Sequence, residues 1–131
     1  QVPLPEGATA LVYSRGSVPA TSLGMLQKGM TSVTAASKTT YTAVASDQIV
    51  VDTAANIVTI TLPATPAVGD EVTIMDGSAT GGFATNNCVV ARNGSNIEGA
   101  ASDDNLTVNN QCVTLIYANA TKGWLYKSTN Q

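Results

Sequence analysis

The sequence contains no histidine among its 131 residues. Histidine is the most common general base in enzymes and the most common metal ligand, so its absence excludes the usual serine and cysteine triads and the usual zinc sites. The glycine-rich and nucleophile motifs of phosphate, dinucleotide and acyl-transfer enzymes are also missing. We therefore expect no enzymatic activity, no catalytic residues, no metal site and no cofactor.

Charged residues are scarce. They make up 11% of the chain, whereas an average soluble domain has roughly 25%. The formal net charge is −3 and the chain has no run of Lys and Arg, which argues against nucleic acid as a partner because phosphate neutralisation needs clustered basic residues. A surface of Thr, Ser and Asn in place of charge is typical of a secreted or surface protein that packs into an assembly.

Long apolar runs and cysteines are also few. No run approaches the roughly 18 to 20 apolar residues that span a bilayer, so we expect no membrane-spanning helix. The only cysteines, Cys88 and Cys112, each lie inside a predicted strand. One interpretation is a disulfide between them, and the other is that each is a small buried hydrophobic residue.

Aromatic residues make up 5% of the chain, with a single tryptophan. Trp124 and Tyr126 alternate along the last predicted strand and so share one side, as the stacking platform of a glycan-binding module requires. The other interpretation is that the tryptophan anchors the core or an interface. The glycine-containing loop at residues 76–87, which we expect to be mobile, would complete such a platform.

Alternation of apolar and polar residues predicts β-strands along most of the chain. The clearest case lies in residues 41–76, where one predicted strand ends at Pro63 and Pro66 and the next begins after a turn at Gly69 and Asp70. Five apolar residues of these two strands should line one buried face: Val58, Ile60, Leu62, Val72 and Ile74.

Strands are predicted at residues 41–45, 48–52, 57–62, 71–75, 88–92, 96–98, 105–108, 112–118 and 124–127. The dipeptide Asn93-Gly94 predicts a tight hairpin between the strands at 88–92 and 96–98, because both positions of such a turn need positive φ. Short strands at this spacing favour an all-β fold, either an antiparallel β-sandwich or a barrel.

The domain organisation follows from the same pattern. Residues 41–131 form one β domain, because strands follow one another there without a linker. Residues 1–40 are rich in Ser, Thr, Gly and Ala and carry Pro3 and Pro5, which favour extended backbone. We expect this segment to be an extended N-terminal arm that finds its contacts on a neighbouring subunit.

Two pairs of adjacent carboxylates have both a chemical and a structural interpretation. Asp70 and Glu71 are one pair, but neighbouring residues of a strand point to opposite faces, so a turn is favoured over an acid and base pair. Asp103 and Asp104, with Asn105, are the oxygen ligands that calcium prefers, although the spacing is not that of an EF-hand loop. A solvated loop is the favoured interpretation of this second pair.

Three segments carry a likeness to known proteins: DTAANIVTITLPATPAVGDEVTIMD, NNCVVARNGSNIEG and VTLIYANATKGWLYK. They resemble a small β module of tailed-bacteriophage virion proteins, which occurs in capsid-decoration, head-fibre and tail-fibre proteins. The likeness spans residues 41–126 and leaves residues 1–40 outside it. The positions that carry it are Asp52, Val58 to Leu62, Pro63, Pro66, Gly69, Asp70, Asn86, Asn87, Arg92, Asn93, Gly94, Ile97, Gly99, Leu106, Gly123 and Trp124.

This resemblance implies a β-sandwich-like fold, a non-enzymatic role on the surface of the virion, and trimeric association, which many members show. The implied partners are other copies of the chain and virion proteins such as the major capsid protein. It carries over no catalytic residue. The alternative within the same family of proteins is a receptor-binding module of a fibre that recognises a glycan of the host surface.

Overall fold

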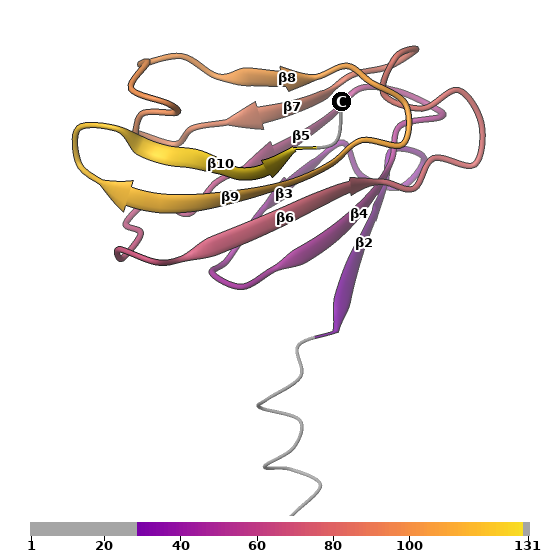
Figure 1. Cartoon of the computed structure of the whole chain (residues 1–131). Coiled ribbons are helices and arrows are strands. Elements are labelled where there is room, and N and C mark those ends of the chain that lie inside the picture. Colours follow the sequence, from indigo (N-terminus) through magenta and orange to yellow (C-terminus); the bar gives the residue numbers. More distant parts are fainter. Residues whose placement is uncertain (1–28, 130–131) are drawn as a thin grey trace, which may run out of the picture.

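The computed structural model describes residues 29–129. The regular secondary structure in this part of the chain consists of β-strands and includes no helix (Figure 1). The strands are β2 (Met30–Thr34), β3 (Thr40–Thr42), β4 (Gln48–Asp52), β5 (Val58–Thr61), β6 (Glu71–Asp76), β7 (Cys88–Ala91), β8 (Asp104–Leu106), β9 (Cys112–Asn119) and β10 (Gly123–Thr129). The prediction of an all-β fold is therefore confirmed for these residues, and most strands lie where the alternation placed them.

The strands form two sheets, and both are mixed. One sheet has five strands in the order β10-β9-β6-β4-β2, and the other has four in the order β3-β5-β7-β8. The pairs β2-β4, β4-β6, β3-β5 and β5-β7 are parallel, and the remaining pairs are antiparallel. The prediction of antiparallel sheets was wrong in this respect, and neither sheet closes into a barrel within residues 29–129.

The parallel pairs arise because the chain changes sheet at every connection from β2 to β7. A strand and its successor run in roughly opposite directions but belong to different sheets, so strands two apart become parallel neighbours in one sheet. The crossover that parallel strands require is thus a strand of the facing sheet and not the usual helix. The corner at Pro63 and Pro66 makes one such crossing, from β5 to β6, and is not a hairpin within one sheet.

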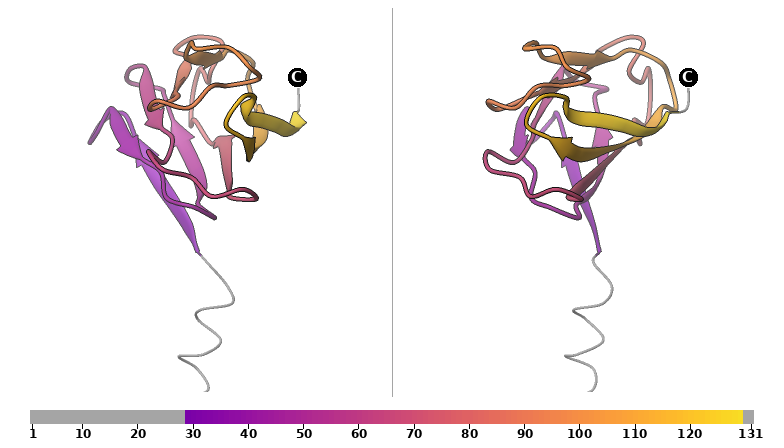
Figure 2. Two further views of the ribbon diagram at one scale, coloured as in Figure 1. Left: turned by 90° about the vertical axis from the view of Figure 1, so that its left-hand side faces the viewer. Right: turned by 60° about the vertical axis from the view of Figure 1, so that its left-hand side comes forward.

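The core is one cluster to which both sheets contribute, and Figure 2 shows the two sheets face to face. The five residues predicted to be buried, Val58, Ile60, Leu62, Val72 and Ile74, are all 0% exposed, which confirms their burial. Val58 and Ile60 come from β5 and Val72 and Ile74 from β6, so they approach the core from opposite sheets. Trp124 and Phe83 are the largest side chains in this core.

The predicted hairpin at Asn93-Gly94 is half correct. Both residues have positive φ, +52° and +95°, as the predicted turn requires. The strand that returns to pair with β7, however, is β8 and not residues 96–98. Ile97 instead makes isolated bridges with Ala100 and with Trp124 of β10, so the chain after the turn reaches over to the other sheet.

The N-terminal boundary also differs from the expected one. Residues 30–34, which the sequence analysis placed in the arm, form β2 and pair with β4 along their whole length. Residue 40 begins β3. Residues 1–28 of the expected arm lie outside the part that the structure describes.

Candidate functional site

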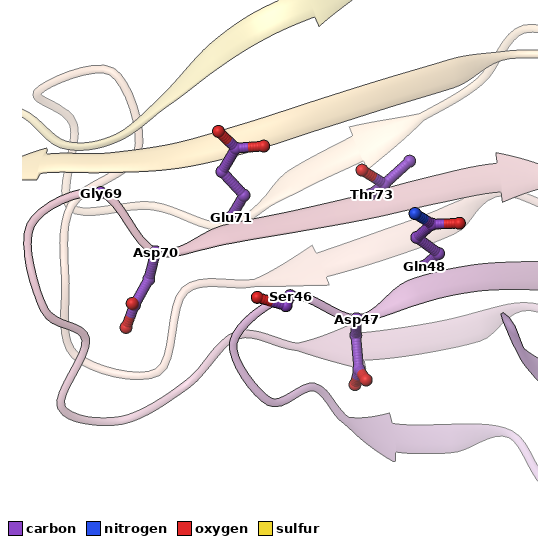
Figure 3. Close-up of a pocket in the computed structure, with 7 residues that line it drawn as sticks. All are labelled: Ser46, Asp47, Gln48, Gly69, Asp70, Glu71 and Thr73. Carbon is purple, nitrogen blue, oxygen red and sulfur yellow. The ribbon is translucent and has the colours of Figure 1, made fainter. Parts of the chain in front are cut away.

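A hollow of the described surface lies where β4 and β6 begin (Figure 3). Its volume is about 350 Å3, and its lining residues are Ser46, Asp47, Gln48, Gly69, Asp70, Glu71 and Thr73. The loops that precede two parallel neighbours meet at this end of the sheet, which is why acidic residues far apart in the sequence come together here. Backbone bonds hold the two loops: the Ser46 amide donates to the Glu71 carbonyl at 2.7 Å.

The three carboxylates of this hollow are each engaged in a different interaction. Asp47 is buried and accepts hydrogen bonds from the Tyr41 hydroxyl and the Val44 amide, both at 2.9 Å. Asp70 accepts the amide of Ala67 at 2.9 Å and so closes its own turn. Glu71 forms an ion pair with Lys127, with an N to O distance of 2.9 Å.

The directions of these side chains agree with the expectation from strand geometry. Asp70 and Glu71 point to opposite sides of β6 in Figure 3, as neighbours in a strand do. Asp76 lies at the other end of β6, and Glu98 lies near Tyr126, so neither carboxylate joins Asp70 and Glu71 in one place. The hollow is therefore a polar depression built from turn and sheet contacts.

Side chains of the five-stranded sheet that point away from the core form what we call the outer face. They follow from the alternation with the buried residues and are Met30, Ser32, Thr34, Gln48, Val50, Asp52, Glu71, Thr73, Met75, Cys112, Thr114, Ile116, Ala118, Leu125 and Lys127. The residues lie in cross-strand rows, one of which is Ser32, Val50, Met75 and Cys112. Threonine, glutamine and half-buried apolar residues dominate this face, and its charged residues are Asp52 and the ion pair of Glu71 and Lys127.

The predicted contact residues Trp124 and Tyr126 do share one side of β10, but that side faces the core. Trp124 is 0% exposed, and its ring meets the Tyr117 ring edge to face with centroids 5.7 Å apart. Tyr126 is half-buried and packs against the same core. The tryptophan therefore offers no exposed ring face to a glycan in this structure.

Tyr126 borders a second, smaller hollow of about 210 Å3, together with Glu98, Asp103 and Asp104. Its hydroxyl donates to the Asp104 carboxylate, and its amide donates to the Glu98 carboxylate at 3.1 Å. Burial, followed by the bond to Asp104 and the nearby negative charges, raises the pKa of Tyr126 well above its ordinary value. The phenol therefore stays protonated and acts as a donor.

The loop expected to be mobile, residues 76–87, is tied to its surroundings by the carboxylate of its first residue, Asp76. The carboxylate of Asp76 accepts the backbone amides of Ser78, Phe83 and Asn110, each at 3.0 Å. Burial alone would raise the pKa of this carboxyl, but the hydrogen bonds, above all those from Ser78, hold the pKa of Asp76 below its ordinary value. Sequence reasoning missed this role, although Asp followed by Gly and Ser is a known turn signal.

The two cysteines lie in different sheets and both are free. Cys88 of β7 is buried in the core, and Cys112 of β9 is partly exposed on the outer face. Burial, with a smaller contribution from the charge of Asp76, raises the pKa of Cys88 to about 12.

The residues weighed as calcium ligands are engaged in protein contacts. Asp103 accepts the amide of Arg92 at 2.9 Å, while Asp104 accepts its bond from Tyr126. Within residues 29–129, no cluster of three or more acidic or cysteine side chains has the arrangement that a metal ion needs. The same residues include no helix long and apolar enough to span a bilayer.

The sequence was compared with family models and with curated proteins, and neither comparison found a match.

Proposed function

We propose that the protein is a non-enzymatic structural component of a tailed-bacteriophage virion, either a capsid-decoration protein or a fibre module. It acts through multivalent contacts with other copies of itself and with virion proteins such as the major capsid protein. The resemblance implies trimers and a β-sandwich, and we propose both for this chain. The protein is then located on the surface of an extracellular particle.

The observation that carries the proposal is the likeness of residues 41–126 to virion modules. The positions in the fold of the residues that carry this likeness support it. Gly69, Asn93, Gly94, Gly99 and Gly123 all have positive φ and turn the chain between strands. Gly123 cannot be replaced without movement, because a Cβ there would lie 1.9 Å from the Asn96 carbonyl oxygen. These five of the shared residues therefore lie at corners of the fold, and Val58, Ile60, Leu62, Ile97, Leu106 and Trp124, also shared, lie in its core.

The chemistry of the outer face supports an assembly role. Removing water from charged groups costs much free energy when a protein contact forms. A face of Thr, Gln and half-buried apolar side chains has few such groups, so it can contact another protein at a low cost. The outer face bears the exposed residue Met30 on the edge strand β2, and the ion pair that Glu71, at the start of β6, forms with Lys127 of the other edge strand, β10.

The attachment point of the N-terminal segment supports an anchoring role for it. Residue 29 leads directly into β2, which is the edge strand of the five-stranded sheet. A segment joined at an edge is placed to reach a neighbouring subunit while the two sheets stay intact. This is the arrangement that a surface protein held by an arm requires.

Electron microscopy of intact particles labelled with an antibody against the chain tests the proposal. We expect label at regular positions on the capsid or on the fibres, in a number set by the particle symmetry. Particles depleted of the protein should regain the label when purified chain is added. Absence of the chain from purified particles would overturn the proposal.

A further inference from the structure

The four edge strands of the two sheets differ in how well they are protected against further pairing. An open edge offers unpaired backbone N–H and C=O groups to another strand, and natural proteins block it with short strands, charges, bulges or covering loops. Within residues 29–129, three of the four edges carry such protection. The fourth, β2, has none of these features.

The edge of β10 is covered and irregular. The Trp124 amide donates to the Asn96 carbonyl at 2.8 Å, and the Glu98 amide donates to the Trp124 carbonyl at 2.7 Å, so residues 96–98 cap this edge. Two register shifts interrupt the pairing of β10 with β9, and Lys127 adds a charge.

The edges of the four-stranded sheet are short. β3 has three residues and lies beside Lys38, whose ammonium is 5.4 Å from the centre of the Tyr41 ring. β8 also has three residues, one of which is Asp104, whose carboxylate accepts the amide of Asn105 at 2.8 Å. Neither edge therefore presents a long row of free backbone groups.

The edge of β2 is regular and uncharged, and no other segment of residues 29–129 pairs with it. β2 pairs in register with β4 over five residues, and the segment from residue 29 to residue 37 contains no charged residue and no proline. Met30 is 57% exposed. The left view of Figure 2 shows the indigo strand at the outer margin of the molecule.

The direction of each backbone group along β2 follows from one hydrogen bond. The Ala35 amide donates to the Asp52 carbonyl at 2.9 Å, so the backbone amide and carbonyl of Ala35 point toward the neighbouring strand β4. Because successive residues point their backbone groups to alternate sides, those of Met30, Ser32 and Thr34 face the open edge. The Thr34 carbonyl already accepts the amides of residues 37 and 38. Among residues 29–129, the backbone amides and carbonyls of Met30 and Ser32 and the amide of Thr34 therefore stay available for pairing at this edge.

We propose that β2 pairs with β2 of a second copy of this chain, antiparallel and centred on Ser32. This inference deepens the proposed function and rests on it for the expectation that copies of the chain meet. The free groups match this arrangement: the two Ser32 residues exchange both hydrogen bonds, and each Thr34 amide donates to the Met30 carbonyl of the other copy. The edge is thus complementary to itself.

A second copy fits this edge better than a charged partner, because the segment has no charge to attract one. It also lets two chains of net charge −3 meet where neither carries a charge, which avoids repulsion at the contact. The pairing joins the two five-stranded sheets into one and makes their outer faces continuous. It is a twofold contact, so it would connect copies of two different trimers.

Charge substitutions at the centre of the pair give the first test. Ser32→Lys and Ser32→Glu each place like charges directly opposite each other, which destabilises antiparallel pairs. In light scattering of the full chain, we expect each variant to show half the mass of the unsubstituted protein. An equal mixture of the two variants should recover the full mass, because opposite charges then meet. Thr42→Lys, at an exposed position on the edge strand β3, is the matched control and should keep the full mass.

Oxidation gives the second test. The hydrogen-bonded pair holds the two Cα atoms about 5.5 Å apart, which suits a disulfide. Ser32→Cys in a Cys112→Ser background should therefore yield a disulfide-linked dimer, and Gln48→Cys in the same background should not.

A monomeric full-length chain would overturn the inference, whether its edge stays free or is covered by its own residues 1–28. An oligomer with the same mass in both Ser32 charge variants would overturn it as well. A monomeric chain would also contradict the proposed trimer, whereas an oligomer of equal mass in both Ser32 variants would overturn this inference alone. Neither result concerns the location of the protein on the particle, which the labelling of intact particles tests separately.

Discussion

The carboxylate of Asp76 accepts a hydrogen bond from the amide of Asn110, which lies 34 residues further along the chain. The same oxygen also accepts the amide of Phe83. One side chain thus ties the loop after β6 to the turn between β8 and β9. Both connections lead from one sheet to the other, so a single carboxylate holds two crossings of the chain together.

Replacing Asp76 by asparagine should destabilise the fold. The variant keeps the size of the side chain but loses the charge that strengthens its hydrogen bonds, and it brings a donor to a site where amide donors converge. We expect a loss of about 1–2 kcal/mol in urea denaturation. Asp70→Asn is the control, because that carboxylate accepts the amide of its own turn at Ala67, and its loss should be smaller. Equal losses would contradict the role given to Asp76.

The same carboxyl predicts how stability depends on pH. Its pKa in the folded state lies below the ordinary value of 3.8, so the unfolded chain takes up the proton more readily. The stabilisation is therefore complete above about pH 4 and is lost as the pH falls through the folded pKa. Thermal unfolding between neutral and acidic pH should show a shallower acid loss for Asp76→Asn than for the unsubstituted chain. Parallel curves would show that another group is responsible.

Gly82→Ala should cost more stability than Gly94→Ala, although both glycines have positive φ of +87° and +95°. A Cβ at Gly82 would lie 2.5 Å from the Asn109 amide oxygen and 2.7 Å from an oxygen of Asp76, whereas nothing lies within 4 Å at Gly94. We expect about 1 kcal/mol for Gly94→Ala and about 2–3 kcal/mol for Gly82→Ala. The difference, measured by denaturant titration, isolates the close approach, and no difference would refute it.

The fluorescence of the single tryptophan should show that its ring is buried in the native protein. Trp124 is fully buried, so its fluorescence in the native protein should be blue-shifted and resistant to acrylamide, and unfolding should shift it to the red. Trp124→Ala should cost about 3–5 kcal/mol through the cavity that it leaves, and Trp124→Phe should cost less. Strong quenching of the native protein would show an exposed ring and would return the residue to the glycan platform.

The two thiols should react at very different rates. Cys112 is partly exposed, whereas burial places Cys88 in the core and raises its pKa to about 12. A thiol reagent at mildly alkaline pH should modify Cys112 in the native chain and both cysteines after denaturation, because the thiolate is the reactive form. Cys112→Ser should abolish the native reaction. Native labelling that survives this substitution would contradict the burial of Cys88.

Sequence reasoning could find the strands but not their partners. The alternation that marks Val58 and Ile60, or Val72 and Ile74, is a local property, so it identified the strands and their buried faces. Pairing depends on where each connection leads, and a short turn looks the same whether it joins neighbours or crosses to the other sheet. The hairpin expected after Asn93 failed for this reason.

The edge strand β2 and the role of Asp76 were harder to predict. β2 carries the β-branched residues Thr31, Val33 and Thr34 but no alternation of apolar and polar residues, and the Ser-, Thr-, Gly- and Ala-rich composition of residues 1–40 led to its assignment to the arm. Asp76 was counted as a loop residue, because its three amide donors come together only once distant turns meet in the fold. Both cases concern contacts that the local sequence does not encode.

The paths of β2 and β10 have a mechanical consequence. These two strands form opposite edges of the five-stranded sheet and run in the same direction, since β2, β4 and β6 are parallel and two antiparallel steps lead on to β10. Tension between the start of β2 and the end of β10 therefore pulls the strands lengthwise past one another. The hydrogen bonds then share the force and do not open one at a time.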